Sequence, residues 1–116
     1  MSEEIRCIAR FKIKPGQLEA FRKVAASCLE NTKNLDTGTL QYDLHLDSEG
    51  SEAICLERYT NSQAMIEHID HVGAENIEGL GATSEVSVEL FGSPSQTLID
   101  RLGGPGVPVY AFVAGL

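Results

Sequence analysis

The ionisable side chains that could do chemistry are concentrated in one stretch, residues 53–71, with the sequence AICLERYTNSQAMIEHIDH. This stretch contains Glu57, Arg58, Tyr59, His68 and His71. His68 and His71 are three positions apart, so on a helix their side chains emerge on nearly the same face. Histidine titrates near neutral pH and is the natural general base in proteins. The stretch therefore predicts a catalytic site in which His68 is the base.

Two other interpretations of the histidine pair stay open on the sequence. The pair could mark a solvated helix end, where histidines interact favourably with the C-terminal helix dipole. It could also bind a metal ion together with Glu67 or Asp70, but a His-x-x-His pair lacks the His-Glu-x-x-His form and any set of cysteines. We therefore predict no metal and name His71 as a candidate substrate-binding residue beside the base.

Glu57 and Tyr59 lie in a strand-like segment just before the histidine pair. Glu57 is either a carboxylate in a ligand pocket or the structural partner of Arg58 or another cation, since a buried carboxylate must be paired or shift its pKa. Tyr59 either orients a ligand or packs at the strand end. We name both as candidate substrate-binding residues. His45, in contrast, is expected to be exposed.

The composition limits the classes of partner. The chain of 116 residues predicts one domain, with a core at about 5–92 and an extension at about 93–116. Nine Lys and Arg against seventeen Asp and Glu give a net charge of −8, which argues against nucleic acid or an anionic membrane as partner. No apolar run is long enough to span a bilayer, and the acidic start at residues 1–4 is unlike a secretory signal. We expect a cytoplasmic location.

The elements that must position these residues follow from hydrophobic periodicity. Alternation predicts strands at residues 5–14, 39–47 and 53–59, with a hairpin turn at 48–51. Between the first two strands, a helical period begins at Gln17 after Pro15-Gly16 and ends near Leu35.

The second half of the chain shows the same succession of elements. Thr60 and Gln63 have the form of a capping box and predict a helix start. A further helix is predicted at 74–80, ended by Gly79 and Gly81, and a strand at 85–90. Ser93 with proline at the next position predicts the start of a short helix through residue 102, and the apolar residues at 107–113 predict a last strand.

This order predicts an α+β fold of the ferredoxin-like β-α-β-β-α-β type, an antiparallel sheet with helices on one face, followed by an extra helix and strand. The alternation predicts apolar patches on the other face of the sheet, through Tyr42 or Cys55 and their neighbours. An exposed apolar sheet face normally marks an interface or a cavity. We therefore predict a homodimer in which two sheets face each other.

Several motifs resemble those of a known family. They are the turn Lys14-Pro15-Gly16, the run Leu56-Glu57-Arg58-Tyr59 continuing into Asn61-Ser62-Gln63-Ala64, His68, and the tail segments 90–95 and 110–115. Across essentially its whole length the chain is similar to the antibiotic biosynthesis monooxygenase family, small dimeric α+β barrels that include quinol monooxygenases.

The resemblance implies a homodimer with one pocket per subunit between sheet and helices. It also implies oxidation of an electron-rich aromatic or quinol by dioxygen without flavin or metal. Such chemistry needs a base, hydrogen bonds to the resulting anion and a water-poor apolar pocket. The chain has no tryptophan, which the haem-degrading relatives use, and this argues against haem degradation.

Two functional hypotheses remain at this point. The first is a cofactor-independent monooxygenase that acts on a small aromatic or quinol, with His68 as the base and with Glu57 and Tyr59 at the polar end of the pocket. The alternative is a non-catalytic dimeric module of the same fold that binds a small ligand or serves in a stress response. No sequence feature separates the two.

Overall fold

The computed structural model describes residues 3–116, and Met1 and Ser2 of the acidic start lie outside the described residues. The strands are β1 (Ile5–Ile13), β2 (Thr39–Leu46), β3 (Glu52–Tyr59), β4 (Ser84–Phe91) and β5 (Val109–Tyr110). The helices are α1 (Leu18–Leu35), α2 (Ser62–Val72), α3 (Ala74–Thr83) and α4 (Gln96–Arg101), followed by a 3₁₀ turn, η1 (Gly104–Gly106).

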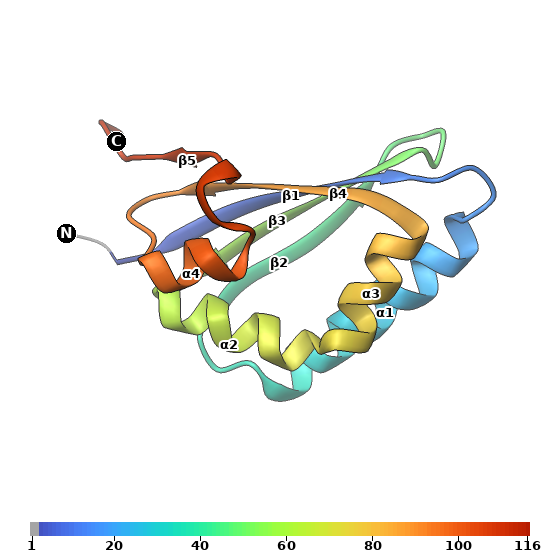
Figure 1. The fold of residues 1–116 in the computed structure, drawn as a ribbon, viewed down its shortest axis with the longest axis horizontal. Coiled ribbons are helices and arrows are strands. Elements are labelled where there is room, and N and C mark those ends of the chain that lie inside the picture. The colour runs from blue at the N-terminus through green and yellow to red at the C-terminus, as the bar shows by residue number, and fades with distance from the viewer. Residues whose placement is uncertain (1–2) are drawn as a thin grey trace.

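The strands form one sheet in the order β2-β3-β1-β4-β5, and the helices cover one of its faces (Figure 1). The first four strands pair antiparallel, whereas β5 pairs parallel to β4. The predicted ferredoxin-like α+β fold is confirmed. Within one chain the sheet stays open, so a single subunit does not close a barrel.

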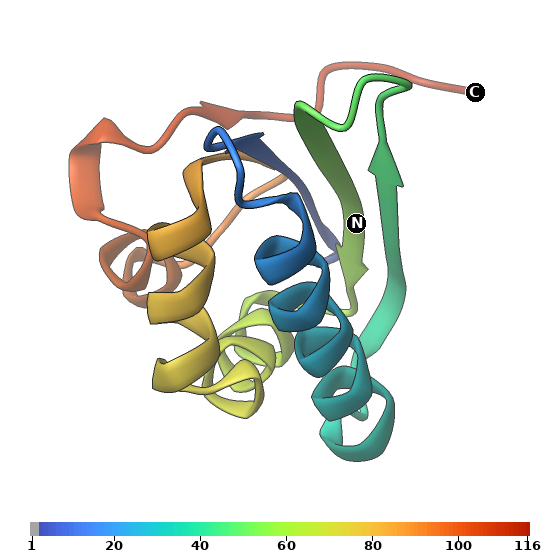
Figure 2. The same cartoon turned by 90° about the vertical axis from the view of Figure 1, so that its right-hand side faces the viewer.

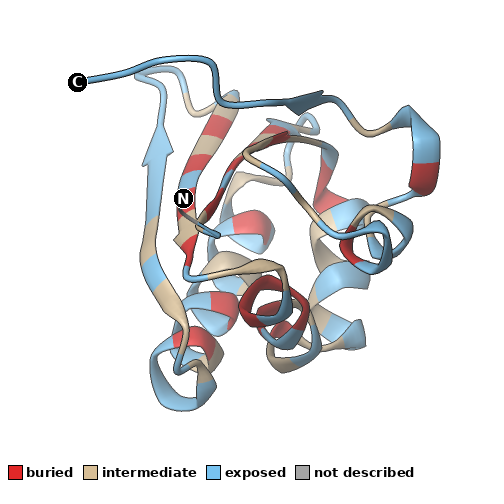
Figure 3. Cartoon of the chain, turned by 90° about the vertical axis from the view of Figure 1, so that its left-hand side faces the viewer, coloured by how far each residue is buried: buried red, intermediate tan, exposed pale blue. Residues whose placement is uncertain are grey.

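The inner face of the sheet is fixed by strand alternation. Cys7 of β1 lies opposite Glu57 of β3, and Ala9 lies opposite Cys55. All four side chains are buried beneath the helices, and Figure 3 shows the alternation as red bands along the strands. The period-two pattern thus fixes which side chains can reach the space between sheet and helices.

The outer face does carry apolar side chains, but the residues that we predicted for it are wrong. Tyr42 and Cys55 point inward, toward the helices, since Tyr42 pairs with Glu57 across β2 and β3. The outer face presents Ile8, Ile54 and Leu56 instead, and Leu56 is 37% exposed. Both faces of β3 are apolar in sequence, so alternation alone does not tell which one the helices cover.

Two helix starts differ by one or two residues from the prediction. Asn61, and not Thr60, caps α2, because its side-chain oxygen accepts the Ala64 N–H at 2.8 Å. Ser95, and not Ser93, caps α4, because its hydroxyl accepts the Leu98 N–H at 3.2 Å. Thr, Asn and Ser are all favourable N-cap residues, so the sequence offers two possible caps at each helix start and does not distinguish between them.

Helix α3 continues through both glycines that were expected to end it, as far as Thr83. Gly79 packs closely against α1, where a Cβ would lie 3.0 Å from Val24 Cγ2. The glycine therefore allows close packing of two helices and is not a stop signal.

The predicted strand at 107–113 is mostly wrong. Only Val109 and Tyr110 form β5, paired with Leu90 and Phe91 at the edge of the sheet. The chain then leaves the sheet (Figure 2), and Phe112 is 79% exposed. A hydrophobic run without a neighbouring edge to pair with does not become a strand.

No helix among residues 3–116 combines the length and the apolar character needed to cross a lipid bilayer.

Candidate active site

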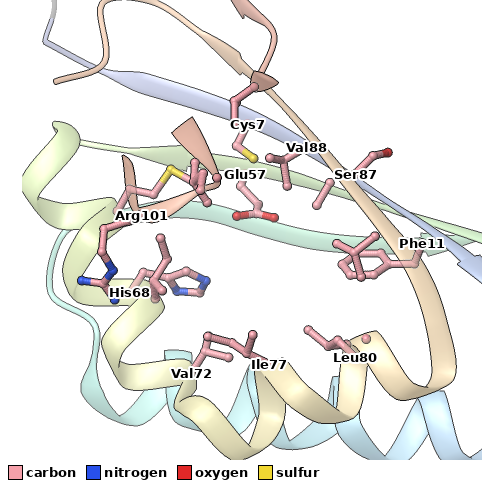
Figure 4. Close-up of a pocket in the computed structure, with 18 of the residues that line it drawn as sticks. Cys7, Phe11, Glu57, His68, Val72, Ile77, Leu80, Ser87, Val88 and Arg101 are labelled. Carbon is pink, nitrogen blue, oxygen red and sulfur yellow. The ribbon is translucent and has the colours of Figure 1, made fainter. Parts of the chain in front are cut away.

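A cavity of about 620 Å³ lies between the inner face of the sheet and the helices α2 and α3 (Figure 4). The segment from Arg101 to Pro108 lines it as well. Most of the lining is apolar, including Phe11, Met65, Val72, Ile77, Leu80 and Val88. This volume and lining are those of a small-molecule site with room for an aromatic ligand.

A few polar side chains interrupt the apolar lining. His68 enters from α2, and Glu57 and Tyr42 enter from the neighbouring strands β3 and β2. The Tyr42 ring lies 5.0 Å from the His68 ring, measured between centroids. These convergent polar groups make this part of the cavity the candidate site of chemistry.

Asp36 holds both histidines of the predicted pair. Its Oδ2 lies 2.7 Å from His68 Nδ1, and its Oδ1 lies 2.6 Å from His71 Nδ1. Thr39 donates its hydroxyl to Oδ2 at 2.6 Å. The side chains of Asp36 and His68 are only 4% and 6% exposed. Because an ionised carboxylate can only accept hydrogen bonds, each Nδ1 carries the hydrogen, and the lone pair of a neutral His68 is then on Nε2.

The environment sets the charges of this cluster. Burial alone would raise the pKa of Asp36, but hydrogen bonds from Thr39, His71 and His68 outweigh it and lower the pKa. Burial lowers the pKa of His68, and the contact with Asp36 only partly opposes that effect. Near neutral pH the pair is therefore a carboxylate and a neutral imidazole, the form in which His68 can accept a proton.

Glu57 has a different environment. It is 8% exposed, and burial raises its pKa to about 7, although hydrogen bonds from Tyr59 and Cys55 oppose the rise. The Tyr59 hydroxyl donates to Glu57 Oε1. The alternative that Glu57 pairs with Arg58 is wrong, because Arg58 binds Glu4 at 2.9 Å. Glu57 is thus a cavity carboxyl that exchanges its proton near neutral pH.

The loop before β2 brings Asp36 to α2. Thr39 pairs with Tyr59, so the start of β2 lies beside the end of β3. Gly38 then packs on the first turn of α2, where a Cβ would lie 2.6 Å from the Ala64 Cβ. Its carbonyl accepts the Thr60 N–H at 2.9 Å. Only glycine allows this close approach, which fixes the loop that carries Asp36.

Helix α1 holds the other end of α2. The Asn31 side chain donates to the carbonyls of His71 at 3.2 Å and Val72 at 3.3 Å. Asn76 donates to the Val72 carbonyl as well, at 2.9 Å. These bonds satisfy carbonyls that the helix end leaves unpaired, and they fix the turn from which both histidines project.

The structure separates the four predicted site residues into two groups. His68 and Glu57 line the cavity, whereas Tyr59 and His71 are not among its lining residues. Tyr59 is fully buried behind Glu57, with its ring 5.2 Å from the His68 ring. His71 is one-third exposed and reaches the site through Asp36. His45 is exposed, as expected.

Sequence reasoning missed Asp36, which directly follows the predicted helix end near Leu35. The two partners are thirty-two positions apart, and no local motif joins them. One signal was present. In a hairpin, the start of the first strand lies beside the end of the second. Asp36 precedes β2 and His68 follows β3, so the predicted hairpin brings the two residues to the same end of the sheet.

Two further observations concern a thiol in the cavity and possible metal ligands. Cys7 lines the cavity, but burial raises the pKa of its thiol, which is therefore protonated at neutral pH and a poor nucleophile. Within residues 3–116, no group of three or more His, Cys, Asp or Glu side chains is arranged to hold a metal ion.

Comparison with known proteins was informative at the level of family and fold. Residues 4–76 match the family model for antibiotic biosynthesis monooxygenase. MupZ from Pseudomonas fluorescens aligns with a TM-score of 0.78 and 21% identity, covering 100% of this chain and 90% of MupZ. SnoaB from Streptomyces nogalater, a cofactor-independent oxygenase, aligns with a TM-score of 0.68 and 18% identity, covering 81% of this chain and 96% of SnoaB.

Rv0793 from Mycobacterium tuberculosis aligns with a TM-score of 0.66 and 25% identity, covering 79% of this chain and 96% of Rv0793. No curated protein matches the sequence.

Proposed function

Because the chain belongs to the antibiotic biosynthesis monooxygenase family, we propose that it oxidises a small aromatic or quinol substrate with dioxygen and without a cofactor. One observation carries the proposal. His68 lines an apolar cavity, and Asp36 holds its Nδ1 at 2.7 Å, which leaves Nε2 as the basic atom. A buried base oriented by a carboxylate is suited to remove a proton from a phenol.

The chemistry then needs no external electron source. His68 accepts the phenolic proton, and the resulting anion donates electrons to dioxygen. A dihydroxyarene plus dioxygen gives a hydroxyquinone plus water, so one oxygen atom enters the ring and the other leaves as water. The substrate itself supplies all four electrons. The apolar lining supports this step, because a water-poor cavity keeps reactive oxygen species from side reactions.

The other predicted residues take supporting roles in this proposal. Glu57, protonated in part near neutral pH, can donate a hydrogen bond to the substrate anion. Tyr59 holds Glu57 through its hydroxyl, and His71 holds the second oxygen of Asp36. Both therefore act on the ligand indirectly, through a residue that lines the cavity or orients the base.

Oxygen uptake with a panel of hydroquinones tests the proposal. We expect uptake by the wild type and a loss of about 100-fold or more in His68→Ala and His68→Gln. His45→Ala is the matched control, since His45 is an exposed histidine on β2, and it should retain the wild-type rate. Absence of uptake with every quinol would favour the non-catalytic module, and an unchanged rate in His68→Ala would remove the base assignment.

We further propose that two copies associate through the open faces of their sheets. Members of this family are commonly dimeric. The supporting observation is the apolar group Ile8, Ile54 and Leu56 on the outer face, together with the exposed tail residues Phe112 and Val113. Burial of such a surface stabilises association.

Light scattering over a concentration series tests the association. Leu56→Glu should shift the chain toward the monomer, because it puts a charge in the centre of the buried face. Leu35→Glu is the control, since Leu35 is 51% exposed at the end of α1, away from the sheet face. A wild-type chain that stays monomeric at all concentrations would contradict the proposal.

A further inference from the structure

One cation lies on the wall of the cavity. Arg101, the last residue of α4, is the only Lys or Arg among the described residues that line it. It belongs to the C-terminal extension, beyond the residues 4–76 that match the family. In a chain with a net charge of −8, a guanidinium at a mostly apolar cavity needs an explanation.

The hydrogen bonding of Arg101 leaves capacity for a ligand. Its Nη2 donates to Asp70 Oδ1 at 2.6 Å, and no other hydrogen bond to its side chain occurs in the described part of the chain. A guanidinium has five N–H donors, and its flat fork matches the two oxygens of a carboxylate. Asp70 therefore fixes the guanidinium of Arg101 and accepts only one of its five N–H donors.

The position of Arg101 relates it to the base. The side chains of Arg101 and Asp70 are 39% and 58% exposed, so the pair lies where the cavity meets solvent. Figure 4 places Arg101 and His68 toward one end of the cavity and Phe11 toward the other. A ligand with its hydroxyl at His68 and its rings along the apolar wall would bring a substituent on the carbon next to that hydroxyl toward Arg101.

We propose that Arg101 is a carboxylate-binding subsite, so that the preferred ligand is a hydroxylated aromatic that carries a carboxylate. The proposal deepens the proposed function, because it takes the same cavity as the ligand site. The rings pack against the apolar lining, and the carboxylate accepts a charge-assisted pair of hydrogen bonds from the guanidinium. Arg101 thus selects among the aromatics that the cavity could hold.

The competing explanation is structural, since the pair Arg101–Asp70 also joins α4 to α2. The two explanations differ in their effect on ligand preference, which Arg101→Gln removes only if Arg101 binds the ligand. If the pair is only a tie, Asp70→Asn and Arg101→Gln weaken the protein alike and leave ligand preference unchanged. If Arg101 binds the ligand, Asp70→Asn frees a donor and removes a competing carboxylate, so anion binding holds or improves.

Binding of two matched, oxygen-stable probes, 3-hydroxy-2-naphthoate and 2-naphthol, tests the subsite by calorimetry. We expect the wild type to bind the carboxylate about tenfold more tightly, and Arg101→Gln to abolish this preference without changing the affinity for 2-naphthol. Arg101→Lys should keep part of the preference, since it retains the charge but not the fork. Asp70→Asn should keep or increase it.

Arg22→Gln is the matched control, because Arg22 forms an exposed ion pair with Glu19 on α1, and it should leave both affinities unchanged. Equal affinity for the two probes in the wild type, no measurable binding of the carboxylate, or an unchanged preference in Arg101→Gln would overturn the proposal. Binding requires no turnover. A carboxylate preference without oxygen uptake would therefore contradict the monooxygenase and leave the subsite standing.

Discussion

Two carboxyl groups lie buried at the same site, and their pKa values shift in opposite directions. Asp36 accepts hydrogen bonds from Thr39, His68 and His71, and its pKa falls. Glu57 accepts from Tyr59 and Cys55, and its pKa rises to about 7. Glu57 lies deeper than Asp36, so burial outweighs its two donors, whereas three donors outweigh burial at Asp36.

The contrast assigns different chemistry to the two groups. An ionised Asp36 fixes which nitrogen of His68 is basic, and it does so without lining the cavity itself. A carboxyl near its own pKa, such as Glu57, can give or take a proton at the cavity wall. One site thus contains a fixed charge behind the base and a titrating group beside it.

The largest effect is expected from removing the fixed charge. Asp36→Ala leaves both histidine Nδ1 atoms without their acceptor, and it should lower the free energy of unfolding by about 3 kcal/mol. Denaturant unfolding measures this change. Asp43→Ala is the control, because Asp43 is exposed on β2, and it should change stability by less than about 0.5 kcal/mol. Equal effects of the two substitutions on the free energy of unfolding would contradict a stabilising role of the Asp36–histidine contacts.

The titrating carboxyl predicts a dependence of stability on pH. The folded pKa of Glu57 lies above its ordinary value of 4.5, so the folded state binds the proton more tightly, and stability falls as pH rises from about 4.5 to beyond 7. Glu57→Gln should remove this loss and raise stability above pH 7 by up to about 3 kcal/mol. Unfolding at pH 5 and pH 8 measures it. A stability gain that is the same at both pH values would contradict the raised pKa.

His68 should show the opposite slope. Its pKa is lowered in the folded state, so stability is lost as pH falls below the ordinary value of 6.5. His68→Gln removes this loss and keeps the pH dependence that comes from Glu57. The variant should therefore lose more stability than the wild type as the pH rises from 5 to 7. Identical pH profiles for the two proteins would show that His68 titrates as an ordinary exposed histidine.

A smaller effect is expected at His71. It donates to the second oxygen of Asp36 but is one-third exposed, so His71→Gln should cost about 1 kcal/mol, less than Asp36→Ala. The substitution should also raise the pKa of Asp36, since it removes a donor. Chemical-shift titration of the carboxyl carbon follows that pKa. A loss as large as that of Asp36→Ala would mean that His71, and not His68, is the main partner.

The smallest effect is expected at Tyr59. Its hydroxyl lowers the pKa of Glu57, so Tyr59→Phe should move that pKa further up, by less than about one unit, and should shift the pH dependence of stability with it. The double variant Tyr59→Phe with Glu57→Gln tests the assignment. If the hydroxyl acts through Glu57, the tyrosine substitution has no effect on pH dependence once Glu57→Gln is already present.

Most of the secondary structure and the order of the elements could be predicted from the sequence, because both depend on the periodicity of neighbouring residues. Alternation in β1 and β3 and the helical stripe of α1 follow from periods of 2 and 3.6, and they indicated the ferredoxin-like order. His68 stood out because it forms a pair with His71 in the stretch where ionisable side chains are concentrated. The tail was less predictable, since residues 111–116 have strand-like composition but no edge to pair with.

The sequence by itself determined the element order, the family and the stretch, Ala53 to His71, that contributes Glu57 and His68 to the cavity lining. The tertiary structure decided which face of β3 is covered, which acid orients His68 and which cation reaches the cavity. The reason is physical. Periodicity acts over neighbouring residues, whereas Asp36, Glu57, His68 and Arg101 meet only because the strands pair and the helices pack on one side.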